Sequence, residues 1–83
     1  MSGYTDIKSK KFKRDILKWL ESIGLEIKSA GKHQIKIKCI HNGKSFPVPA
    51  NHPEINKYMI DNLMKFLVTN EMCTKEEFDE RIK

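Results

Sequence analysis

Hydrophobic side chains between Lys10 and Ile23 recur at steps of three and four residues, as on one face of an amphipathic helix. This pattern predicts a helix over that range. Gly24 follows at once and can adopt the left-handed conformation that ends a helix. We interpret the apolar face as packing surface and not as a platform for stacked bases. Its members are Phe12, Ile16, Trp19, Leu20 and Ile23.

Beyond Gly24 the pattern changes to alternation, which is typical of extended chain. Leu25 and Ile27 begin a short strand, a turn follows over residues 29–31, and a second strand is predicted from His33 to Ile40. Side chains on alternate residues of this second strand share a face. One face holds His33, Ile35, Ile37 and Cys39, and the other holds Gln34, Lys36, Lys38 and Ile40.

Asn42-Gly43 is a strong hairpin signal, because a type I′ turn requires positive φ at both central positions. The chain is therefore expected to return in a third strand over Ser45–Val48. Pro47 cannot donate a ladder hydrogen bond. This third strand is predicted to be short, or to lie at an edge of the sheet where Pro47 faces outward.

Two further helices are predicted in the second half of the chain. Pro53 is a suitable first helical residue, and Thr74 with Glu77 forms a capping-box pattern, with Cys73 and Phe78 placed as a hydrophobic staple. Phe78 and Ile82 give the last helix an apolar side. The apolar face of the helix after Pro53 is expected to contain Ile55, Tyr58, Met59, Asn62, Leu63, Phe66 and Leu67, continuing toward Val68.

These elements predict an α+β fold in a single domain spanning residues 1–83. The expected order is helix, three antiparallel strands, helix and a short C-terminal helix over residues 74–82, with two helices packed on one face of the sheet. An α-β-β-β-α chain of this kind resembles the double-stranded-RNA-binding domain. A chain of 83 residues leaves little room for a deep cavity, so a functional site is expected near the surface.

Charge is distributed unevenly along the chain, whose net charge is +5. Residues 1–44 contain eleven Lys or Arg and four Asp or Glu, whereas residues 45–83 contain five and seven. No acidic residue lies between Glu26 and Glu54. A basic stretch of this kind favours nucleic acid as a partner, although a lysine-rich surface that only keeps the protein in solution is the alternative. The lysines of the stretch are Lys28, Lys32, Lys36, Lys38 and Lys44.

The polar amino terminus and the shortness of the apolar runs predict a cytoplasmic protein with no membrane partner, since a bilayer span needs about 20 apolar residues. Cys39 and Cys73 are expected to be reduced, half-buried small residues. A metal site built from these cysteines with His41 and His52 lacks a recognised ligand spacing. His41 is instead expected to flank the hairpin turn, and His52 to precede the helix.

Three motifs carry a more specific resemblance. They are "IGLEI" (residues 23–27) at the end of the first helix, Gly31-Lys32-His33 before the second strand, and Val48-Pro49 after the hairpin. From about Lys10 to Val68 the chain resembles the HicA family of bacterial toxins, in which Gly-Ser-His stands where this chain has Gly31-Lys32-His33. Lys32 thus replaces the usual serine, and the C-terminal helix lies outside the resemblance.

The resemblance implies a ribosome-independent ribonuclease that cleaves messenger RNA, needs no metal, uses His33 as its catalytic residue and is silenced by a HicB antitoxin. Histidine suits proton transfer near neutral pH, from a ribose 2′-hydroxyl or to the leaving 5′-oxygen. The candidate RNA contacts are Lys32, Lys36, Lys38, Lys28 and Lys44.

Other interpretations of the same residues stay open. His33 can instead pack at the edge of the core, and the domain can be a non-catalytic RNA- or DNA-binding module or an interaction domain for an acidic protein partner. The acidic C-terminal segment either docks on the core or shields a basic RNA site within a homodimer.

Overall fold

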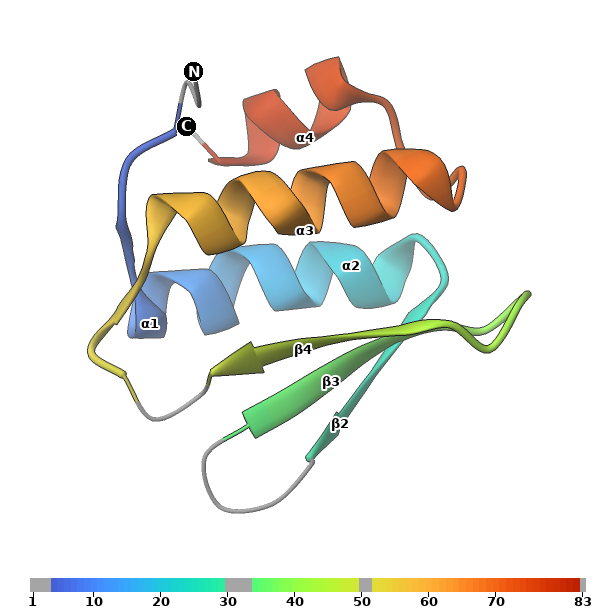
Figure 1. Cartoon of the computed structure of the whole chain (residues 1–83), viewed down its shortest axis with the longest axis horizontal. Helices are drawn as coiled ribbons and strands as arrows, with labels where there is room; N and C mark the ends of the chain where they lie inside the picture. Colours follow the sequence, from blue (N-terminus) through green and yellow to red (C-terminus); the bar gives the residue numbers. More distant parts are fainter. Residues whose placement is uncertain (1–3, 30–33, 50–51, 83) are drawn as a thin grey trace.

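The computed structural model describes residues 4–29, 34–49 and 52–82 and shows an α+β protein with a three-stranded antiparallel sheet and three helices (Figure 1). We call α1, the π-helical segment η1 and α2, which run without a break, the first helix (residues 9–22). The elements are β1 (Ile7–Lys8), α1 (Ser9–Lys11), η1 (Phe12–Leu17), α2 (Lys18–Ser22), β2 (Leu25–Ser29), β3 (Gln34–Cys39), β4 (Ser45–Pro49), β5 (Glu54–Ile55), α3 (Lys57–Thr69) and α4 (Lys75–Ile82).

The first helix lies where the three- and four-residue spacing predicts it. Phe12, Ile16, Trp19 and Leu20 are buried, as expected for a packing face. Its middle is π-helical, which was not predicted, and Leu17 is buried there beside Ile16. Gly24 ends the helix with φ +106°, in the left-handed region predicted for it.

The sheet has the order β2-β3-β4, and its core face is built by alternate residues. Ile37 is fully buried and lies opposite Ile27 on β2 and Phe46 on β4. The predicted alternation is confirmed over Gln34–Cys39, while His33 lies outside the described residues. Ile40 does not extend the strand; it lies in the turn and is 64% exposed.

The connection between β3 and β4 is wider than the predicted type I′ turn, and that prediction is wrong. Gly43 has φ +75°, but among the described non-glycine residues only Glu71 has positive φ, so Asn42 does not. The Gly43 N–H donates to the Cys39 carbonyl over 2.8 Å, which closes a four-residue connection. Asn42 stays at negative φ because its side chain has other partners: Oδ1 accepts from the Lys44 N–H (2.9 Å) and Nδ2 donates to Asn70 Oδ1 (2.8 Å).

β4 is an edge strand, as its prolines predict. The Cys39 N–H donates to the Lys44 carbonyl over 2.8 Å. Hydrogen-bonded pairs alternate along an antiparallel ladder, so the next ones on β4 are at Phe46 and Val48. Pro47 and Pro49 fall between them, and their backbone nitrogens face away from β3.

α3 begins at Lys57 and not at Pro53, where the sequence predicted a helix start. The Pro53 carbonyl accepts a 3.0 Å hydrogen bond from Ser9 N–H, and Ile55 pairs with Ile7 in a two-stranded sheet that was not predicted. Asn56 is the cap: its Oδ1 accepts from the Tyr58 N–H over 2.7 Å. This cap together with the β1–β5 pairing keeps residues 53–55 out of the helix.

The buried face of α3 is rotated from the predicted one. Leu63 and Leu67 are buried as expected, but Tyr58 is 64% exposed and Asn62 is also exposed. Lys57 Nζ lies 5.4 Å from the centre of the Tyr58 ring, so this aromatic has a partner on the surface. The residues that α3 buries are Ile60, Leu63, Met64 and Leu67.

α4 is joined to the same core as the other helices, above the first helix and α3 in Figure 1. The predicted capping box is confirmed: Thr74 Oγ1 accepts from the Glu77 N–H (3.1 Å), and Glu77 Oε1 accepts from the Thr74 N–H (3.0 Å). Phe78 has no exposed surface and lies edge-on to Tyr4, with ring centres 5.7 Å apart. The last helix therefore closes the core.

Candidate nucleic-acid interface

Three lysines gather on the face of the sheet opposite its buried side chains. Strand alternation turns Ile27 and Ile37 toward the core, which leaves Lys28 on β2 and Lys36 and Lys38 on β3 to face the other way. We call these three residues the lysine face. With Gly43 and Ser45 they line a depression of about 250 Å³, and none of the described residues that line it is acidic. The depression is a surface on which an anionic chain can lie.

The pairing register brings two of these cations together. Lys28 lies directly opposite Lys36 on the neighbouring strand, a position in which Cβ atoms are about 5 Å apart and like charges destabilise each other. Glu26 lies opposite Lys38 and its Oε1 is 3.0 Å from Lys28 Nζ. One acidic residue therefore offsets three lysines, and a phosphate bound in the depression would relieve the remaining repulsion.

Not all of the predicted RNA contacts join this group. Lys44 does not line the depression. Its carbonyl accepts from the Cys39 N–H, so Lys44 lies opposite Cys39 in the ladder. Burial raises the pKa of the Cys39 thiol, and the positive charge of Lys44 partly opposes this increase. Lys32 and the predicted catalytic residue His33 lie outside the described residues.

The remaining histidines form no site with the lysine face. His41 lies in the hairpin turn and His52 before β5, and both are exposed. His52 does not directly precede a helix as expected, because β5 follows it and α3 begins only at Lys57. Its carbonyl instead accepts a hydrogen bond from Ser9 Oγ at the start of α1. Over residues 4–29, 34–49 and 52–82, no three His, Cys, Asp or Glu side chains gather as metal ligands. The set Cys39, His41, His52 and Cys73 is thus not assembled.

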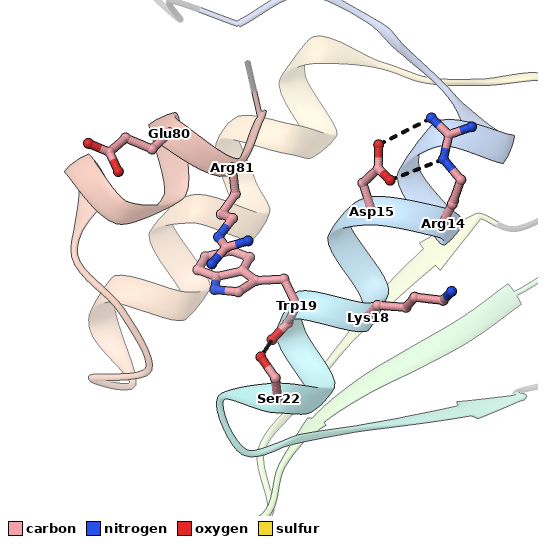
Figure 2. Close-up of a pocket in the computed structure, with 7 residues that line it drawn as sticks. All are labelled: Arg14, Asp15, Lys18, Trp19, Ser22, Glu80 and Arg81. Atoms are coloured by element: carbon pink, nitrogen blue, oxygen red, sulfur yellow. Dashed lines mark hydrogen bonds and ion pairs between the residues drawn. The ribbon is translucent and has the colours of Figure 1, made fainter.

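A larger hollow, of about 490 Å³, lies between the first helix and α4 (Figure 2). Its cations are accompanied by acids: Arg14 pairs with Asp15 at 3.1 Å, and Glu80 stands beside Arg81 in sequence. The Arg81 guanidinium carbon lies over the Trp19 ring, 5.7 Å from its centre, as Figure 2 shows. Trp19 is only 8% exposed. The hollow therefore offers a less favourable site for a polyanion than the lysine face, and its tryptophan is a packing residue.

A third hollow, of about 470 Å³, lies where α3 turns into α4, and Cys73 lines it together with Val68 and Met72. Burial and the neighbouring Glu77 carboxylate raise the pKa of the Cys73 thiol to about 11. A thiol with such a pKa is protonated at neutral pH, so Cys73 is a poor nucleophile there. Sequence reasoning identified neither hollow, because each joins residues from separate elements.

Comparison of the chain with protein-family models, with curated proteins and with solved structures finds no match. In the part of the chain that the structure describes, no helix has both the length and the apolar character needed to cross a bilayer.

Proposed function

We propose that this protein binds RNA through the lysine face and cleaves it with His33, as a HicA-like ribonuclease that a HicB-like antitoxin neutralises. One observation supports RNA binding: Lys28, Lys36 and Lys38 come together around a depression whose described lining contains no acidic residue. The order of the large elements, one helix, three antiparallel strands and a helix, also agrees with the double-stranded-RNA-binding-domain architecture that the sequence suggested.

The chemistry assigned to each residue follows from its side chain. The ammonium groups of the lysine face would hold successive phosphates and stabilise charge that develops during cleavage. His33 directly precedes Gln34, the first residue of the strand that carries Lys36 and Lys38. An imidazole there would take the proton of a 2′-hydroxyl as its oxygen attacks the adjacent phosphorus and the bond from phosphorus to the 5′-oxygen breaks; the imidazolium would then return that proton to the 5′-oxygen.

Binding is tested by titrating a fluorescent single-stranded RNA at several salt concentrations. The variant Lys28→Gln/Lys36→Gln/Lys38→Gln removes three phosphate contacts, so the slope of log K against log salt should become shallower by about 2. The matched control is Lys10→Gln/Lys11→Gln/Lys57→Gln, which removes the same charge from exposed positions elsewhere. Equal losses in the two triple variants would show that the lysine face is not the binding site.

Cleavage is tested separately, by incubating wild-type protein, His33→Ala and His41→Ala with RNA in the presence of a chelator. The proposal predicts cleavage by the wild type and by His41→Ala and none by His33→Ala. If all three bind RNA equally and none cleaves it, the protein is a non-catalytic RNA-binding module. If His33→Ala cleaves as the wild type does, the assignment of His33 is wrong.

A further inference from the structure

The two edges of the three-stranded sheet differ in their capacity to pair with another strand. Of the three outward positions on β4, Ser45, Pro47 and Pro49, two are prolines with no N–H to donate, so this edge is largely blocked. β2 contains no proline, and within the described ranges no strand pairs with its outer side. Figure 1 shows β2 as the outermost strand on the side away from β4. β2 is thus the edge open to strand addition.

The backbone groups that face this open edge follow from the ladder. The Ile40 N–H donates to the Gly24 carbonyl over 3.4 Å, so residue 24 makes its hydrogen bond toward β3. Residues that bond inward and outward alternate in an antiparallel pair. Glu26 and Lys28 therefore bond toward β3, and Leu25 and Ile27 direct their N–H and C=O groups outward.

We propose that two copies of the chain pair antiparallel along β2, about a two-fold axis at Ile27, and form a continuous six-stranded sheet. In this register Ile27 bonds to Ile27 of the second copy through the outward backbone groups. Glu26 then lies opposite Lys28 of the second copy, and Lys28 opposite Glu26, so both cross-copy pairs are attractive. An axis at Glu26 or at Lys28 would place two like charges opposite each other, so the charges favour the Ile27 register over both neighbouring ones.

The dimer also improves the surroundings of Lys28. In one copy Lys28 has Lys36 on its inner side; in the dimer it gains a carboxylate on its outer side. An axis perpendicular to the sheet keeps the helices of both copies on one face and the two lysine faces on the other, where they adjoin. Self-association rests only on the β2 edge and does not depend on the proposed function.

The expected affinity is modest. β2 contributes five residues, a length of about 17 Å, and small interfaces are typical of transient complexes. We therefore expect a monomer–dimer equilibrium that shifts with protein concentration.

Sedimentation equilibrium of the full chain without nucleic acid tests the proposal. Glu26→Lys and Lys28→Glu, at side chains that are 45% and 56% exposed, each turn the two attractive pairs into repulsive ones. Each should raise the dimer dissociation constant about tenfold or more. The double variant Glu26→Lys/Lys28→Glu restores opposite charges in the same register and should dimerise like the wild type. An equimolar mixture of the two single variants should form a heterodimer.

Glu76→Lys and Lys10→Glu are the matched controls, since they change the net charge equally at exposed positions off the sheet. Each control should dimerise like the wild type, and circular dichroism should show that all variants are folded. A wild-type protein that stays monomeric up to about 1 mM overturns the proposal, as does a double variant that fails to recover dimerisation. RNA binding is measured in a separate assay, so its absence would leave this result unchanged.

Discussion

The two cysteines show how strongly position sets the chemistry of one side chain. Cys39 has no exposed surface, since it lies on the core face of β3. Cys73 is half-buried in the connection just before α4, where burial and the Glu77 carboxylate raise its pKa to about 11 from the ordinary 9.0. Both effects disfavour the thiolate, so the folded protein holds this proton more tightly than the unfolded chain does.

We expect alkylation of the folded protein by iodoacetamide to follow a pH profile with a midpoint of about 11, because only the thiolate reacts. In urea the midpoint should fall to about 9. Cys39→Ala should keep the native profile, and Cys73→Ala should abolish most native-state labelling. A native midpoint near 9 would contradict the assigned environment.

The raised pKa of Cys73 also makes the free energy of unfolding depend on pH. Because the folded-state pKa is the higher one, the stabilisation is complete below pH 9 and is lost as pH rises from about 9 to about 11. Urea unfolding of wild type and Cys73→Ala over this range should show the wild type losing free energy of unfolding faster. If the free energies of unfolding of the two proteins fell in parallel with pH, the raised pKa of Cys73 would be contradicted.

Only part of the lysine face could be predicted from the sequence. Strand alternation alone places Lys36 and Lys38 on one face. That Lys28 lies opposite Lys36 depends on the β2–β3 register, which the sequence does not state. Lys44 was grouped with them by sequence proximity, but the four-residue turn before it places it opposite Cys39 and outside the depression.

At the level of elements, local signals predicted most helix and strand positions, and long-range pairing explains the failures. The periodicity of the first helix and the Thr74–Glu77 capping box needed only neighbouring residues. Pro53 is also a good local start signal, yet Ile55 beyond it pairs with Ile7, far away in sequence. A two-residue strand has no recognisable pattern of its own, so neither β1 nor β5 could be predicted.

The start of α3 at Lys57 can be tested through its cap. Asn56→Ala removes the side chain that accepts from Tyr58 N–H and should lower the free energy of unfolding by about 1 kcal/mol, which corresponds to a melting temperature roughly 4–8 °C lower. Asn62→Ala is the matched control, an exposed asparagine inside the same helix. It should be neutral or slightly stabilising, since alanine is the better helix former. Equal effects of the two changes would argue against Asn56 as the cap.

At the level of the whole molecule, Tyr4 in the amino-terminal segment contacts α4 beside the first helix. Tyr4 donates a 2.5 Å hydrogen bond from its hydroxyl to Asp79 Oδ1, and its ring packs on Phe78. The centres of the Trp19 and Phe78 rings lie 6.2 Å apart. Burial and the Asp79 hydrogen bond raise the pKa of the Tyr4 hydroxyl, which keeps it a donor. α4, which lies outside the family resemblance, is therefore part of the core and not an appendage.

Replacing Phe78 tests whether α4 folds together with the sheet and the other helices. Because its side chain is fully buried between Tyr4 and Trp19, Phe78→Ala should lower the free energy of unfolding by about 3–5 kcal/mol, a large share of the stability of a domain this size. Phe78→Leu, which keeps most of the volume, should cost much less. Urea unfolding followed by Trp19 fluorescence and by far-ultraviolet circular dichroism measures both. If α4 were an independent appendage, Phe78→Ala would leave the main unfolding transition unchanged; a single transition shifted in both signals would show that the last helix folds with the sheet and its other helices.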